Sequence, residues 1–256
     1  MTAHAALEVS QLDKRFGGLH VTQNVSFTVP GGSVTALVGP NGAGKTTLFN
    51  LVTNLVRPGS GRVRLFGQDL AGIEGAGIAA LGLIRTFQSA RVFPGMTALQ
   101  NVMTGAHHTI AGGVLPYAAW LPGARRAERA LRDRAAALMS LIGLERYQDA
   151  HATDLPIGAQ KLLEVARALM ARPRLLLLDE PAAGLNDAET AELAALLRAI
   201  QAGGVAVLVV EHNMGLVMNV ADQVVVLDAG RVIASGPPAA VQRDPAVVAA
   251  YLGADA

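Results

Sequence analysis

The sequence contains no cysteine, and aromatic residues make up only 4% of its 256 positions. The missing thiols exclude a disulfide framework and a thiolate zinc site, and they suit a reducing compartment. Although 51% of the residues are hydrophobic, no apolar run reaches the roughly 18 to 20 residues that a membrane-spanning helix needs. We therefore expect no transmembrane segment. Residues 1–10 have no basic cluster before an apolar stretch, so they do not predict a secretory signal.

A large excess of charge of either sign is also absent. The 21 lysines and arginines nearly balance the 20 aspartates and glutamates, which leaves a net charge of +1. A protein dedicated to binding duplex DNA usually has a basic face, so this balance argues against a nucleic-acid partner. The length suffices for one large domain, or for one domain that carries a subdomain.

Four short apolar runs predict buried strands at residues 34–38, 175–178, 205–210 and 224–227. Each run is continuous, which is typical of strands covered on both faces of a parallel sheet. Helical patterns separate the runs. One of them follows Asn186, which can cap a helix together with Glu189. The sequence thus predicts an α/β fold in which helices connect the strands of a mostly parallel sheet.

Three stretches depart from this alternation. Residues 7–29 and 62–66 alternate apolar with polar side chains, which predicts antiparallel strands at one edge. Residues 89–159 contain a charged amphipathic segment at 125–147 and predict a helical insertion. Within it, residues 105–123 are apolar but broken by prolines and glycines. A surface hairpin is the favoured interpretation of that part, and a membrane-dipping loop is the alternative.

The sharpest motif is a glycine-rich loop between the strand at 34–38 and a helix predicted at 47–55. It consists of Gly39, Pro40, Asn41, Gly42, Ala43, Gly44, Lys45, Thr46 and Thr47. This order fits the phosphate loop of nucleoside triphosphate-binding proteins. Glycines let backbone amides turn toward phosphates, and the start of the helix adds its positive dipole end. Lys45 supplies a cation for the β and γ phosphates of ATP, and the Thr46 hydroxyl suits Mg²⁺, which prefers oxygen ligands.

An acidic pair, Asp179 and Glu180, follows the apolar run at 175–178. Ligands of open parallel sheets bind beyond the carboxyl ends of the strands, which is where this pair stands. We expect Asp179 to anchor Mg²⁺ through a water molecule. Glu180, one position further, is the expected general base for the attacking water. A turn or capping role is the alternative for the pair taken alone, but the phosphate loop upstream favours catalysis.

The chain resembles the nucleotide-binding subunits of ABC transporters along nearly its whole length, and three further residues add to this resemblance. Phe16 falls where the family places an aromatic ring that stacks on adenine. Gln88 matches the glutamine that in the family senses magnesium and the γ phosphate, so it is both a catalytic and a metal-site candidate. His212 matches the family's switch histidine and joins Glu180 as a catalytic candidate.

The resemblance also implies a fold and its division. We expect a P-loop NTPase (RecA-like) core with a mostly parallel sheet, an antiparallel β edge subdomain and an inserted α-helical subdomain. Residues 1–256 would form a single ABC ATPase domain. Its catalytic core with the antiparallel edge would comprise residues 1–88 and 160–256, and residues 89–159 would form the helical subdomain.

The signature segment of the family appears here as Leu155, Pro156, Ile157, Gly158, Ala159 and Gln160. In the family two subunits face each other head to tail, and the signature of one covers the ATP on the phosphate loop of the other. The resemblance therefore implies that Leu155 and Gly158 contact nucleotide. Pro156 replaces a usual serine and Ala159 a usual glutamine. We therefore expect the two sites of the working pair to be unequal.

Local stretches at 85–101, 180–186 and 244–253 narrow the resemblance to the ATP-binding subunits of branched-chain amino acid importers. This implies hydrolysis of ATP with Mg²⁺ by a peripheral subunit at the cytoplasmic face of the inner membrane. The implied partners are a second ATP-binding subunit, in a homodimer or heterodimer, permease subunits, and indirectly an external solute-binding protein. Arg91, Phe93, Pro94 and Met96 are candidates for a groove that accepts a permease helix, with plain loop packing as the alternative.

Other functions remain open at this stage. Similar ATPases serve urea or amide importers and lipopolysaccharide exporters, and some soluble ABC ATPases have no permease. The soluble ones usually carry two cassettes or a long coiled coil, whereas this chain has one phosphate loop and no sustained heptads. A GTPase would need an Asn-Lys-x-Asp guanine-reading segment, which the sequence lacks.

Overall fold

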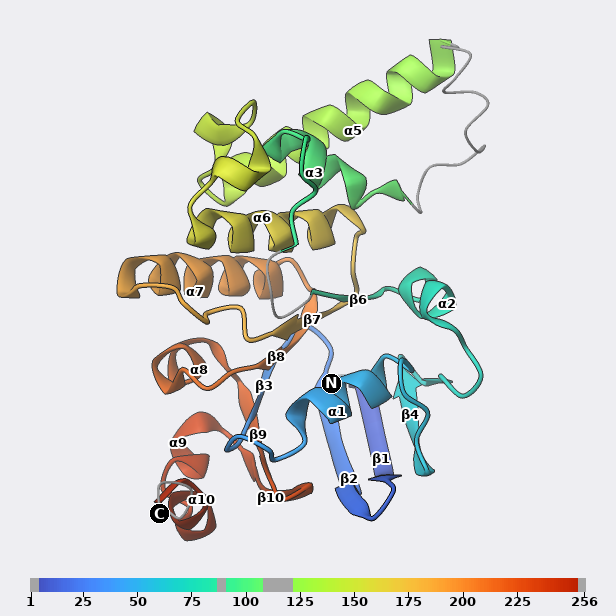
Figure 1. Cartoon of the computed structure of the whole chain (residues 1–256), viewed down its shortest axis with the longest axis vertical. Coiled ribbons are helices and arrows are strands. Elements are labelled where there is room, and N and C mark those ends of the chain that lie inside the picture. The colour runs from blue at the N-terminus through green and yellow to red at the C-terminus, as the bar shows by residue number, and fades with distance from the viewer. Residues whose placement is uncertain (1–4, 87–90, 108–121, 253–256) are drawn as a thin grey trace. The chain divides into compact units, whose positions relative to one another are not determined.

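The computed structural model describes residues 5–86, 91–107 and 122–252, which form two compact units (Figure 1). The first unit comprises residues 1–85, 174–183 and 197–256, and the second comprises residues 86–173 and 184–196. The predicted insertion at residues 89–159 lies within the second unit. That unit also includes α6 (Ile157–Met170) and the beginning of α7 (Asp187–Ala202).

A six-stranded sheet with the order β10-β9-β3-β8-β7-β6 lies at the centre of the first unit. Its strands are β3 (Val34–Val38), β6 (Leu83–Arg85), β7 (Leu175–Asp179), β8 (Ala206–Val210), β9 (Gln223–Asp228) and β10 (Arg231–Gly236). All neighbouring pairs are parallel except β9 with β10. The four predicted apolar runs fall on β3, β7, β8 and β9, which confirms the mostly parallel α/β sheet. Strand β6, which has only three residues, and strand β10 were not predicted from the sequence.

The alternating stretches form a separate four-stranded sheet with the order β2-β1-β4-β5. Its strands are β1 (Ala5–Phe16), β2 (Leu19–Pro30), β4 (Ser60–Leu65) and β5 (Gln68–Asp69), all antiparallel. Alternate side chains such as Val25, Phe27 and Val29 are buried. Because only one face is apolar, this sheet packs on the core with that face and leaves the other to solvent. The predicted antiparallel strands are thus confirmed, as a sheet of their own.

One hydrophobic core joins both sheets of the first unit through α1 (Lys45–Val52). Phe49 of α1 is fully buried with Leu177 of the parallel sheet and Leu7 of the antiparallel sheet. The helix begins at Lys45 because the preceding Gly44 has φ 99°, which is outside the helical region. The remaining helices of this unit are α2 (Gly75–Ala80), α8 (Met214–Val220), α9 (Pro238–Val241) and α10 (Pro245–Leu252).

The second unit is helical, as expected. It contains α3 (Ala98–Thr104), α5 (Pro122–Leu141), α6, the start of α7, and single 3₁₀ turns at Glu145–Tyr147 and Ala152–Asp154. The predicted helix at 125–147 ends at Leu141 because Gly143 turns the chain with φ 68°. The predicted cap of α7 is confirmed: Asn186 N donates to Glu189 Oε2, and Glu189 N donates to Asn186 Oδ1, both at 3.0 Å.

No helix within the described ranges is long and apolar enough to cross a membrane. Most of the stretch interpreted as a hairpin or a membrane-dipping loop lies outside those ranges, at residues 108–121.

Candidate functional site

Three predicted motifs meet at one edge of the parallel sheet. Strands β3, β8 and β7 are neighbours and run parallel, so their carboxyl ends lie side by side. The phosphate loop follows β3, Glu180 follows Asp179 at the end of β7, and His212 follows β8 by two residues. Tertiary pairing thereby brings the acidic pair and His212 beside the phosphate loop, which precedes them by more than 100 positions in the sequence.

The phosphate loop is pressed against its neighbours in the first unit. A Cβ atom added to Gly39 (φ 152°) would clash with the carbonyl oxygen of Leu227, and one added to Gly44 (φ 99°) would lie 2.8 Å from the carbonyl oxygen of Val21. Only glycine fits such backbone contacts. A Cβ added to Gly42, in contrast, would meet nothing within 4 Å. The open space beside the middle of the loop fits a phosphate chain.

Lys45 lies folded over this loop. Its Nζ donates hydrogen bonds to the carbonyl oxygens of Gly39 at 2.6 Å and Pro40 at 3.0 Å, and the residue is only 8% exposed. Burial lowers the pKa of the Lys45 ammonium, and the charges of Glu180 and Asp179 act in the opposite direction. The ammonium is thus placed beside the loop and within the field of both carboxylates of the acidic pair.

Asp179 is 4% exposed, and its Oδ2 accepts a hydrogen bond from Nη2 of Arg85 at 2.9 Å. Thr46, in contrast, is exposed. Among the residues that the structure describes, no group of three or more His, Asp or Glu side chains could hold a metal by itself. One carboxylate and one hydroxyl, completed by phosphate oxygens and water, are nevertheless the donor set that suits Mg²⁺. The residues therefore fit a magnesium–nucleotide complex.

Glu180 begins a turn held by a residue that the sequence analysis missed. Its φ of 48° is left-handed, and its backbone N donates to the carbonyl oxygen of Val210 at 2.9 Å. Glu211 is fully buried and accepts hydrogen bonds from Ala182 N at 2.7 Å and His212 N at 3.1 Å. This carboxylate links the turn after β7 to the histidine after β8. The available signal was a charged residue directly after an apolar run, because such a charge needs partners when it is buried.

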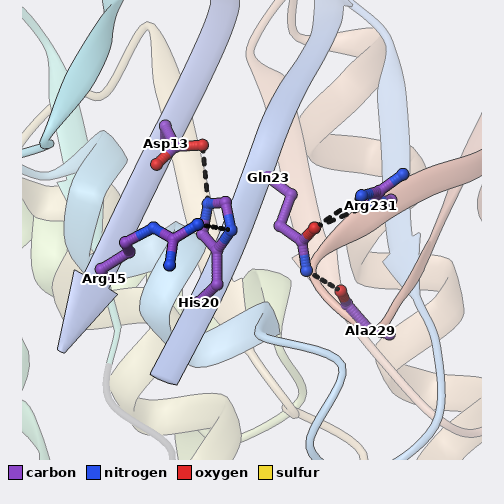
Figure 2. Close-up of polar contacts among 6 residues, drawn as sticks. All are labelled: Asp13, Arg15, His20, Gln23, Ala229 and Arg231. Atoms are coloured by element: carbon purple, nitrogen blue, oxygen red, sulfur yellow. Dashed lines mark hydrogen bonds and ion pairs between the residues drawn. The ribbon is translucent and has the colours of Figure 1, made fainter. Parts of the chain in front are cut away.

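Phe16 stands at the end of β1 with 48% of its surface exposed, and Nζ of Lys14 lies 5.1 Å from the centroid of its ring. Figure 2 shows a hydrogen-bonded chain on the same hairpin, in which Arg15 Nη2 lies 2.8 Å from His20 Nδ1 and His20 Nε2 lies 2.7 Å from Asp13 Oδ2. Because arginine only donates, Nδ1 accepts and Nε2 carries the proton. The chain of contacts stabilises the hairpin that presents Phe16.

A second group in Figure 2 ties the antiparallel sheet to the β9–β10 turn. Gln23 donates from its backbone N to the carbonyl oxygen of Gly230 at 2.7 Å and from Nε2 to that of Ala229 at 3.1 Å. Arg231 donates to Gln23 Oε1 from Nε at 3.0 Å and from Nη2 at 2.8 Å. Gly230 N in turn donates to the carbonyl oxygen of Ala43 at 3.0 Å. The turn therefore connects the Phe16-bearing sheet to the phosphate loop.

Comparison with known proteins decides the family. Residues 22–183 match the family model described as ABC transporter, and residues 231–256 match one described as branched-chain amino acid ATP-binding cassette transporter. The chain belongs to the ABC transporter family. Membership confirms the predicted P-loop NTPase fold and the predicted ATPase class.

Relatives of this ABC protein match it over nearly its full length. The high-affinity branched-chain amino acid transport ATP-binding protein BraF of Pseudomonas aeruginosa is 42% identical over 248 residues, which cover 96% of this chain and 97% of that protein. The corresponding protein LivG of Escherichia coli K12 is 40% identical with the same coverage. A crystal structure of a nucleotide-free ATP-binding cassette from an ABC transporter has a TM-score of 0.82 at 30% identity, covering 96% of this chain and 98% of that one.

The remaining predicted site residues of the ABC cassette are not brought to this edge by any described contact. Gln88 lies outside the described residues. Leu155 (4% exposed) and Gly158 belong to the second unit, where Pro156 caps the start of α6. A Cβ added to Gly158 would clash with the Glu189 carboxylate, so a larger residue there would displace that side chain. Their contact with nucleotide stays a prediction.

The lowered pKa of Lys45 can be measured directly, because the chain has only two other lysines, Lys14 and Lys161. In NMR spectra of the ¹³C-labelled protein, the Lys45 signal, assigned by its loss in Lys45→Arg, should titrate below the ordinary lysine pKa of about 10.4. The folded state then loses this proton before the unfolded state does. Raising the pH through the lowered pKa should therefore increase the free energy of unfolding. A Lys45 titration midpoint at or above the ordinary lysine pKa would mean that the two carboxylates raise this pKa more than burial lowers it.

Proposed function

We propose that the chain is the ATP-hydrolysing subunit of an importer for branched-chain or other hydrophobic amino acids. The observation that carries this proposal is the meeting of the phosphate loop, the acidic pair and His212 at one edge of the parallel sheet. The match of residues 231–256 to a branched-chain amino acid transporter model and the names of the BraF and LivG relatives support the substrate class.

In this proposal the phosphate loop binds the triphosphate of ATP. The nine residues from Gly39 to Thr47 surround it with backbone amides, the Lys45 ammonium and the Thr46 hydroxyl, and Phe16 stacks on the adenine. Thr46 and Asp179 hold Mg²⁺, and Gln88 completes the metal site. Magnesium, when bound, neutralises charge on the β and γ phosphates. Since Lys45 donates to loop carbonyls here, binding exchanges those hydrogen bonds for bonds to phosphate oxygens.

Hydrolysis relies on Glu180 as the general base. Its carboxylate accepts a proton from the attacking water, and the left-handed turn at φ 48° fixes where the side chain leaves the backbone. His212, which is exposed after the neighbouring strand β8, aids hydrolysis as the switch histidine. Glu211 keeps both in place, because it accepts backbone hydrogen bonds from Ala182 and His212.

A second ATP-binding subunit completes the site. Leu155 and Gly158 of one subunit cover the ATP held by the other, with the first turn of α6 offering backbone amides. Pro156 and Ala159 remove polar side chains from this segment, so the two sites are unequal in a heterodimer whose second subunit keeps those side chains. Solved cassettes of the same fold include dimers, at 22% and 23% identity.

The permease docks on the second unit, at the loop that holds Phe93 and Met96. These apolar side chains are 47% and 38% exposed. The fully buried Asn101 stabilises the loop through its side chain. Its Oδ1 accepts a hydrogen bond from Phe93 N at 2.7 Å, and its Nδ2 donates to the carbonyl oxygens of Phe93 and Thr97 at 3.2 and 3.1 Å. The guanidinium of Arg167 lies 5.3 Å from the Phe93 ring centroid. The arrangement presents an apolar surface to a permease, and in this proposal the subunit binds there as a peripheral protein on the cytoplasmic face of the inner membrane.

Glu180→Gln should abolish turnover while preserving nucleotide affinity. Removing a general base typically costs about 10²- to 10⁴-fold in rate, whereas Lys45 and the loop still bind ATP. ATP hydrolysis by the purified transporter and binding of a fluorescent ATP analogue measure the two effects.

An uptake experiment tests the substrate class. In a strain lacking the native gene, wild type should restore leucine, isoleucine and valine uptake, and Glu180→Gln should not. Normal hydrolysis by the variant contradicts the role of Glu180; restored urea uptake or lipopolysaccharide export in place of amino acid uptake contradicts the substrate class.

Phe93→Ala should weaken association with the permease about tenfold or more, since a central aromatic anchor carries much of the energy of an interface. Leu141→Ala is the matched control, because Leu141 is 56% exposed elsewhere in the same unit. Co-purification of tagged permease in detergent measures both. Equal recovery with the two variants would show that the Phe93 loop is only packed against its own unit.

A further inference from the structure

We infer that Arg85 is a positioning residue that orients Asp179 and ties it to the phosphate-loop helix α1. The inference deepens the proposed function, because it rests on Asp179 as the magnesium anchor. Arg85 stands in a stretch that the sequence analysis connected only with the type of transporter, and the proposed mechanism gives it no task.

Strand register places Arg85 beside the acidic pair. β6 runs parallel to β7 with Arg85 opposite Leu177. Side chains alternate along a strand, so Asp179, two residues after Leu177, points to the same face of the sheet as Arg85. The ion pair from Arg85 Nη2 to Asp179 Oδ2 at 2.9 Å follows from that register. The ion pair is made through Oδ2, so the guanidinium fixes the orientation of the carboxylate as a whole.

The same guanidinium also contacts α1. Its Nη1 donates to Asn50 Oδ1 at 2.7 Å and lies 3.4 Å from Thr53 Oγ1. The guanidinium carbon lies 5.4 Å from the ring centroid of the fully buried Phe49. One planar group therefore joins the end of β7 to the helix whose first residues are Lys45 and Thr46. It fixes the spacing between the carboxylate and the hydroxyl that are proposed to share one cation.

Burial makes this bridge selective for arginine. The side chains of Arg85 and Asp179 are only 13% and 5% exposed, so both charges depend mainly on partners within the protein. An arginine fork can bond a carboxylate and a second acceptor at once, whereas a lysine ammonium is a point charge. The Lys45 ammonium also attracts Asp179. Without Arg85, the carboxylate would turn toward the ammonium needed for phosphate and away from the metal position.

The test is the Mg²⁺ dependence of ATP binding by the full chain, because a purely structural ion pair would not change it selectively. Isothermal titration gives ATP affinity in EDTA and at increasing Mg²⁺. Groups that orient a metal ligand typically contribute 10- to 100-fold to metal affinity, so Arg85→Gln should raise the half-saturating Mg²⁺ concentration about 10- to 100-fold. The affinity measured in EDTA should stay within about twofold of wild type. An unchanged Mg²⁺ midpoint overturns the inference.

Three further variants sharpen the result. Arg85→Lys keeps the positive charge but loses the two-sided hydrogen bonding of the guanidinium, so it should shift the Mg²⁺ midpoint as Arg85→Gln does. A wild-type midpoint with lysine overturns the inference that one guanidinium bridges Asp179 and α1. Asn50→Ala removes the tether on α1 and should shift the midpoint in the same direction by a smaller factor. Arg174→Gln removes an exposed arginine just before β7, at its opposite end, and should leave the midpoint unchanged. If circular dichroism shows that Arg85→Gln is unfolded, the Mg²⁺ midpoint of Asn50→Ala decides: an unchanged midpoint overturns the inference.

Asp179→Asn separates failure of this inference from failure of the proposed function. If wild type shows no Mg²⁺ dependence, or if Asp179→Asn keeps it, the proposed metal site is wrong. If Asp179→Asn loses that dependence while Arg85→Gln and Asn50→Ala behave as wild type, the metal site stands and the positioning role of Arg85 is overturned.

Discussion

Parallel pairing of β3 with β8 and of β8 with β7 is the constraint on which the site depends. Hydrogen bonds between parallel strands bring three carboxyl ends to one edge, although the residues that follow them are far apart in the chain. The phosphate loop, Glu180 and His212 occupy that edge. The strands themselves are buried on both faces, so their side chains hold the edge rigid, while Thr46 and His212 beyond it are exposed.

Buried polar groups then set the positions of these residues more finely. Glu211 accepts backbone hydrogen bonds on both sides of the site, and Arg85 joins Asp179 to α1. Gly230 connects the phosphate loop to the antiparallel sheet through Ala43 and Gln23. Each of these groups is costly to bury unless its partners are in place. They therefore favour one arrangement of the loop, the carboxylates and the sheet that carries Phe16 over its alternatives.

Much of the fold could be predicted because its signals are local. Continuous apolar runs marked β3, β7, β8 and β9, alternation marked β1 and β2, and the cap formed by Asn186 and Glu189 marked the start of α7. Strand β6 escaped prediction because three residues carry too little periodicity. The role of Glu211 escaped as well, because a glutamate after an apolar run is ordinary in sequence. Only its burial beneath two backbone segments distinguishes it.

The sequence by itself determined the chemistry available to this ABC protein: a phosphate loop of fixed spacing, an acidic pair after a buried strand, and short elements whose periods allow only an α/β fold. Local patterns suffice for that, since loop conformation, capping and strand burial depend on near neighbours. The tertiary structure alone decided which distant groups share the site. Strand order and register place Arg85 on Asp179 and Glu211 beneath His212, and contacts of that kind depend on packing between segments that no local pattern specifies.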